Sequence, residues 1–121
     1  MRSKWIEHRG KKIFFQDFSD LMYDADALKK ELTQVQAEVI KHPKNSLLIL
    51  SDFRETNITN EMMPILNASS ALTKAHVHKT AVLGVTGIKR TLADLLTRLT
   101  GQQLKYFESE QAAKDWLIQD E

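Results

Sequence analysis

The sequence contains no cysteine among its 121 residues. This absence excludes disulfide bonds, thiolate metal sites and cysteine nucleophiles. Long apolar runs are also missing, since the longest are Leu47–Leu50 and Ala81–Val85, the second counting Gly84. Both are far shorter than the roughly 20 residues that cross a membrane, and residues 1–20 hold no apolar stretch of the kind found in a secretory signal. We therefore expect a soluble, cytoplasmic protein with no transmembrane segment.

An excess of charge of one sign is the third absence. The chain has 17 basic and 16 acidic residues, which give a net charge of +1 near neutral pH. Nucleic-acid binders usually carry a basic excess or a basic stripe, so we expect no binding to nucleic acid. Hydrophobic residues make up 42% of the chain and charged residues 27%. This composition and length are typical of one globular domain, which we expect to span residues 1–121.

The apolar patterns predict strands that alternate with helices. Glycine, proline and capping residues mark the boundaries between them. The predicted elements, in chain order, are strands over 4–8 and 11–18, a helix from Asp24 or Asp26 to about His42, a strand over 46–53, a helix from Thr59 or Asn60 to about Ala75, a strand over 79–85, a helix from Thr86 to Gly101, a strand over 105–108 and a helix from Ser109. The order β-β-α-β-α-β-α-β-α indicates an α/β fold with a mostly parallel sheet, to which the first strand is attached as a hairpin.

The spacing of apolar residues also predicts which faces are buried. The run Leu47–Leu50 has no polar interruption, so we expect an internal strand that is covered on both faces. The predicted inward positions of three helices are Leu28, Leu32, Val35 and Val39 in the first; Met62, Ile65, Leu66, Ser69 and Leu72 in the second; and Ala112, Ala113, Trp116 and Leu117 in the last.

Two stretches resemble a known family. LLILSDFRETNIT (47–59) and KTAVLGVTGIKRTLADLLTRLTGQQLKYFESEQAAKDWL (79–117) are similar to SpoIIAA-like domains, relatives of the STAS fold. The resemblance extends over about Trp5 to Ile118. It implies a β/α superhelix around a small sheet, which agrees with the predicted order of elements. It also implies a non-enzymatic regulatory domain that binds protein partners.

The resemblance further implies a position for a regulatory phosphate. Some STAS regulators are phosphorylated in an Asp-Ser-Ser-Gly-like segment at the start of the helix that follows the central strand. The comparable stretch here is Ile58-Thr59-Asn60-Glu61, which has neither the serine pair nor the glycine. Thr59 is therefore the positional counterpart of the phosphoacceptor. The fold also resembles CRAL-TRIO lipid-exchange domains, which favours a small amphipathic ligand.

A glycine turn from Gly84 to Lys89 precedes the helix predicted at Thr86. It is neither a Walker loop nor a dinucleotide fingerprint. Free N–H groups at a helix start receive anions, and Lys89 and Arg90 would add positive charge. The alternative is that Thr86 caps the helix, while the cations are solvated or, for Arg90, paired with Asp94.

A second candidate site follows the predicted strand 46–53. Asp52 and Arg54 lie at its carboxyl end, where ligands of open α/β sheets bind. We expect them to share one rim with the glycine turn, which gives an anion site of Asp52, Arg54, Thr86, Gly87, Lys89 and Arg90. In the competing interpretation Asp52 and Arg54 form an ion pair with each other.

Other chemistry finds little support in the sequence. The pair His76 and His78 lacks the further ligands that a structural zinc site needs, so we expect no metal and no cofactor. Ser69 and Ser70 lie within a predicted helix and outside any nucleophile elbow, so we expect no catalytic residue.

The sequence allows two roles for four further residues. Met62-Met63 and Met22-Tyr23 form either an adaptable contact patch or core filler.

The sequence leaves two functions open. The first is a non-enzymatic regulatory or protein-interaction domain of the STAS type, with a protein partner or self-association. The alternative is a carrier or sensor of a small anionic or lipid-like ligand bound at the C-terminal rim of the sheet.

Overall fold

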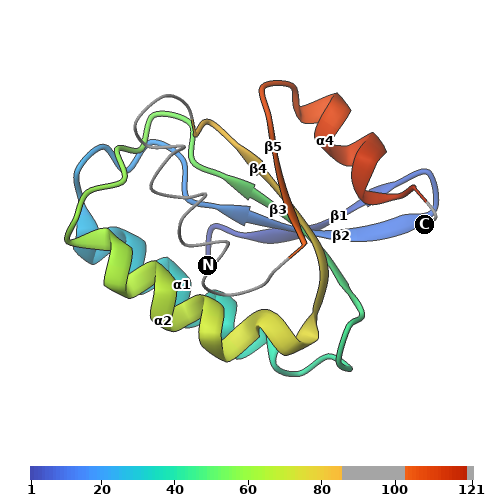
Figure 1. Ribbon diagram of the computed structural model, residues 1–121, viewed down its shortest axis with the longest axis horizontal. Coiled ribbons are helices and arrows are strands. Elements are labelled where there is room, and N and C mark those ends of the chain that lie inside the picture. The colour runs from blue at the N-terminus through green and yellow to red at the C-terminus, as the bar shows by residue number, and fades with distance from the viewer. Residues whose placement is uncertain (86–102, 120–121) are drawn as a thin grey trace.

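Five strands form one sheet in a computed structural model that describes residues 1–85 and 103–119 (Figure 1). The elements are β1 (Lys4–His8), β2 (Lys11–Asp17), α1 (Ala25–Val39), β3 (Leu47–Asp52), α2 (Met62–Thr73), a 3-10 turn η1 (Lys74–His76), β4 (Val77–Leu83), β5 (Leu104–Phe107) and α4 (Glu110–Leu117). The strand order is β1-β2-β3-β4-β5. β1 runs antiparallel to β2 and the other pairs are parallel, which confirms the predicted hairpin and the mostly parallel sheet. The helix predicted from Thr86 to Gly101 lies outside the described residues.

The hairpin owes its geometry to a two-residue turn. Arg9 and Gly10 have φ angles of 50° and 84°. Two consecutive left-handed residues twist the chain in the sense that suits a β-hairpin. The turn sets a register in which Trp5 lies opposite Phe14 and Ile6 opposite Ile13.

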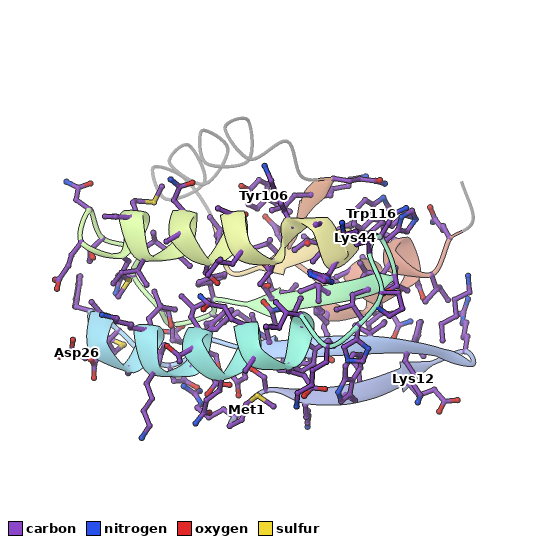
Figure 2. The ribbon with its side chains drawn as sticks, turned by 90° about the horizontal axis from the view of Figure 1, so that it is seen from below. Met1, Lys12, Asp26, Lys44, Tyr106 and Trp116 are labelled. Atoms are coloured by element: carbon purple, nitrogen blue, oxygen red, sulfur yellow. The ribbon has the colours of Figure 1, made fainter. Side chains whose placement is uncertain are left out.

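β3 is the central strand, as its apolar run predicts. Successive side chains of a strand point to opposite faces of the sheet. Leu47 and Ile49 therefore pack with α1 and α2, whereas Leu48 and Leu50 pack with α4. Helices cover both faces, and α1 and α2 lie side by side over one of them (Figures 1 and 2).

α1 begins as expected and ends earlier. Asp24 caps it by accepting a hydrogen bond from the Ala27 N–H. The predicted inward residues are all buried. The last helical residue is Val39, three positions before the predicted end at His42, and Ile40 is the C-cap.

Two predicted inward positions are wrong. In α2, Leu72 is 62% exposed and Thr73 is buried instead. Neighbouring helical residues lie about 100° apart, so only one of the two can face the sheet. In α4, Ala112 is exposed whereas Ala113 and Leu117 are buried, although Ser109 caps the helix as predicted.

Candidate functional site

The rim at the carboxyl ends of β2 and β3 consists of two loops joined by backbone hydrogen bonds. The Asp20 N–H donates to the Arg54 carbonyl (2.9 Å), the Met22 N–H to Glu55 (3.0 Å) and the Asn57 N–H to Met22 (2.7 Å). Because both loops are tied to each other, the rim is a single structural unit.

Thr56 lies at the centre of this unit. Its hydroxyl accepts a hydrogen bond from the Leu21 N–H (3.0 Å) and donates one to the Phe18 carbonyl. The residue is 1% exposed. One buried side chain thus satisfies backbone groups of the neighbouring loop, as buried polar groups require.

The rim also contains unusual backbone conformations. Asp20, Met22 and Glu55 have φ angles of 58°, 53° and 60°, although none is glycine. The left-handed region costs a side-chain-bearing residue roughly 1 kcal/mol. Three such residues within two adjoining loops persist only because the surrounding hydrogen bonds hold them, and such strain is found most often at functional sites.

Asp52 and Arg54 lie at this rim, as expected, but they bind each other. The Asp52 carboxylate accepts hydrogen bonds from the Arg54 backbone N–H (2.9 Å), Nε (3.0 Å) and an Nη (2.8 Å). Its side chain is 4% exposed. The hydrogen bond with Asp52 is the main cause that raises the pKa of Arg54, with smaller contributions from Glu110. The geometry matches the ion-pair interpretation of these two residues.

The pair also connects the rim to α4. Arg54 lies 3.4 Å from a Glu110 oxygen, and the other Glu110 oxygen lies 2.9 Å from Lys114 Nζ. Both carboxylates and both cations are therefore engaged. The other predicted members of the anion site, Thr86, Gly87, Lys89 and Arg90, lie outside the described residues, so their role stays a prediction.

Thr59 has a structural partner of its own. Its hydroxyl accepts a hydrogen bond from the Met62 N–H (3.2 Å) and so caps the first turn of α2. The residue is half-buried. The structure thus gives the side chain a capping role, and its role as a phosphoacceptor stays a prediction.

The four residues of the predicted contact patch separate into two groups. Met62 is fully buried and Met63 packs partly against the core, which is the core-filler alternative. Met22 and Tyr23 are 53% and 69% exposed. The exposed pair lies in the loop before α1, within the hydrogen-bonded rim.

A cavity of about 120 Å³ lies between the sheet and the two helices α1 and α2. Its lining combines apolar and hydroxyl-bearing side chains. The described lining residues are Gln16, Phe18, Leu32, Val35, Ile49, Ser51, Phe53, Ile58, Leu66, Ser69, Ser70, Thr73, Val77, Thr80, Val82, Val85, Leu104 and Tyr106. None of these described residues is a histidine, an acid, a lysine or an arginine.

Sequence reasoning missed this cavity. A signal was present, because Ser69 and Thr73 of α2 occupy positions that face the sheet, where apolar residues normally lie. Gln16, Ser51 and Thr80 are polar residues on the opposing face of the sheet. Polar residues at core positions of both layers mark a place where the layers do not close completely.

The histidine pair is used in hydrogen bonds with the chain. His76 Nδ1 donates to the His42 carbonyl (2.7 Å), and His78 Nδ1 lies 3.1 Å from the Asn45 side-chain oxygen. Within residues 1–85 and 103–119, no cluster of three or more His, Cys, Asp or Glu residues has the arrangement of a metal site. No helix of the same residues is long and apolar enough to cross a membrane.

Comparison with known proteins identifies the fold family. The family model described as SpoIIAA-like matches residues 16–118. The chain belongs to the SpoIIAA-like family. SpoIIAA-like domains are typically non-enzymatic and regulatory, and they often mediate protein interactions.

A solved structure has the same fold. It is an uncharacterised protein of the DUF3478 family with a SpoIIAA-like fold from Shewanella loihica. Its TM-score is 0.68 at 16% identity, over 96% of this chain and 92% of that one. At this identity the likeness extends to the fold alone. None of the curated proteins compared with the chain matches it significantly.

Proposed function

We propose that this SpoIIAA-like chain is a non-enzymatic regulatory domain whose rim binds a protein partner. The observation that carries the proposal is the exposure of Met22 and Tyr23 on a loop that is fixed to its neighbour. Tyrosine is enriched among the residues that dominate binding energy, and methionine adapts to irregular surfaces. A partner would bury both side chains.

The fixed backbone of the rim favours binding. A loop that is already ordered loses little conformational entropy when a partner docks on it. The Met22 N–H and carbonyl are both hydrogen-bonded to the facing loop, so the position of the exposed pair is set before binding. Strain at Met22 is consistent with a functional role for this loop.

The chemistry of the described residues supports binding rather than catalysis. The buried carboxylate of Asp52 is held by Arg54 and is not directed at a substrate. Ser69 faces a cavity whose described lining provides no histidine or carboxylate as a general base.

Capture experiments test the rim. The immobilised chain is exposed to a lysate of the organism that produces it, alongside a Met22→Ser, Tyr23→Ser variant. The matched control is Ile40→Ser with Leu72→Ser, because Ile40 and Leu72 are 55% and 62% exposed at the far ends of α1 and α2. We expect the rim variant to recover at least tenfold less partner than the wild-type chain, whereas the control should recover as much as wild type.

The capture result has clear alternatives. Equal recovery by the rim variant and the control would refute docking at the rim. Sedimentation velocity of the purified chain shows whether the partner is a second copy. If it is, the pure wild-type chain should form dimers and the Met22→Ser, Tyr23→Ser variant should remain monomeric.

A second candidate function is a carrier or sensor of a small amphipathic molecule. The cavity favours it, because its lining joins apolar side chains to hydroxyl groups. Native mass spectrometry of freshly purified protein separates the two functions. A copurified small molecule supports the carrier, and a mass of the chain alone, together with a captured partner, supports the interaction domain.

A further inference from the structure

We propose that the cavity between the sheet and helices α1 and α2 binds a small, uncharged amphipathic molecule, whose polar group hydrogen-bonds to Ser69 and Thr80. The inference rests on the second candidate function, for which it names the ligand class and the contacts. It is independent of partner docking at the rim.

Two hydroxyl groups that line the cavity support the proposal. Ser69 and Thr80 are 5% and 6% exposed, and both line the cavity. Within the described part of the chain, no hydrogen bond joins either hydroxyl to another residue, whereas Thr73 donates to the Ser69 carbonyl and Ser51 to Gln16. Neither hydroxyl oxygen is among the fully buried polar atoms that lack a partner, so both open into the cavity. Both hydroxyls are therefore available to a polar group bound there.

The distribution of side chains makes the cavity amphipathic. Ser69 and Thr73 lie in the second half of α2, and Thr80 lies in the middle of β4. These hydroxyl-bearing residues face the cavity from both layers. Apolar side chains line the rest of its described surface, among them Phe18, Phe53, Ile58 and Val85.

The described lining favours an uncharged ligand. These described residues include no cationic or anionic side chain, so none of them would pair with a charged ligand that loses its hydration. A neutral hydroxyl or amide group loses less hydration free energy on entering the cavity, and it can form hydrogen bonds with serine and threonine hydroxyls.

The volume of the cavity limits the size of its ligand. The cavity measures about 120 Å³, and in another protein an apolar cavity of about 150 Å³ binds benzene. A single ring or a short chain with one polar group is the expected scale. Phenol is the matching probe, with benzene as its analogue without a hydroxyl and benzoate as its charged analogue.

Titration of ¹⁵N-labelled protein, followed by NMR, tests the proposal. We expect phenol to shift the resonances of cavity residues and to bind about tenfold more tightly than benzene, the gain of one net hydrogen bond. Benzoate should not bind. Ser69→Ala and Thr80→Val should each weaken phenol binding about tenfold and leave benzene binding unchanged.

The control variant is Thr33→Val, which removes an exposed hydroxyl of α1 that bonds only to the Lys29 carbonyl in the described structure. This variant should change neither the affinity for phenol nor the affinity for benzene. Equal binding of phenol and benzene, preferred binding of benzoate, or phenol binding that survives both cavity variants would each overturn the proposal. Failure of all three probes would mean that the hydroxyls bind water only, which also overturns it. The rim proposal would survive this failure if the Met22→Ser, Tyr23→Ser variant still captured less partner than wild type.

Discussion

At the scale of single residues, two glycines with similar backbone angles differ in their surroundings. Gly10 and Gly84 have φ angles of 84° and 83°. A Cβ at Gly10 would meet nothing within 4 Å, but one at Gly84 would lie 2.5 Å from the Arg54 nitrogen and 2.7 Å from the Phe53 carbonyl carbon. The end of β4 thus approaches the rim so closely that only glycine fits.

We expect Gly84→Ala to destabilise the fold more than Gly10→Ala. The Gly10 variant should lose roughly 1 kcal/mol of unfolding free energy, from the left-handed backbone alone. The Gly84 variant should lose about 2 kcal/mol more, because rigid backbone atoms must move. Urea denaturation of both measures the difference, and equal losses would mean that the close approach to Arg54 is absent.

Glu31 of α1 provides a pH-dependent contribution. Burial alone would raise its pKa, but hydrogen bonds from the Ser3 hydroxyl and from the Arg2 and Ser3 N–H groups outweigh burial and lower it. A lowered pKa in the folded state means that the stabilisation is complete above the ordinary glutamate pKa of about 4.3. It is lost as the pH falls below that value.

Glu31→Gln should accordingly cost about 2 kcal/mol at neutral pH, since hydrogen bonds to a charged acceptor are lost. The difference from wild type should shrink as the pH is lowered from about 5 to 3. Glu7→Gln, at an exposed position of β1, is the control. A difference that stays constant over this range would contradict the ionised state of Glu31.

At the scale of elements, each strand residue belongs to one of two helix layers. Ile49 packs against α1 and α2, and Leu50 packs against α4. Ile49→Asp and Leu50→Asp should each prevent folding, because an unpaired buried charge costs on the order of the whole stability. Leu72→Asp, on the exposed side of α2, should fold. Circular dichroism decides, and a folded Leu50→Asp protein would show that α4 does not seal its face.

The same elements show how far sequence patterns reach. Periodicity, caps and the turn at Gly10 were sufficient to predict five strands, their order along the chain and the caps at Asp24 and Ser109. Leu72 was misplaced because hydrophobicity favoured it over Thr73, whereas the helix turns Thr73 inward. Which of Leu72 and Thr73 faces the sheet depends on the cavity beside Thr73, and this cavity forms only when the helix layer packs on the sheet.

The candidate site was partly predictable for the same reason. Strand ends placed Asp52 and Arg54 at the rim, since this follows from topology alone. That these two residues also pair with each other depends on side-chain geometry, which the three hydrogen bonds from Arg54 show. No periodic pattern reports the pairing of two loops through Thr56.

At the scale of the whole molecule, the two faces of the sheet are closed by different means. On the α4 face, the buried Lys79 donates to the Trp116 and Gln119 carbonyls, and His8 lies 2.8 Å from Asp115. These contacts fix the last helix to β4 and to the hairpin. The opposite face holds the cavity, and the rim beside it presents Met22 and Tyr23. The two proposed binding places, the cavity and the rim, are thus separate from the α4 face.

Amide hydrogen exchange of the chain, with and without its captured partner, tests the central claim that the rim is the docking surface. The Asp20, Met22 and Asn57 amides bond across the two rim loops near exposed side chains. Their exchange reports local opening of this unit. The account predicts that the partner slows exchange at these amides at least tenfold while α4 is unchanged. Protection confined to α4 or to β5, with the rim amides unaffected, would contradict it.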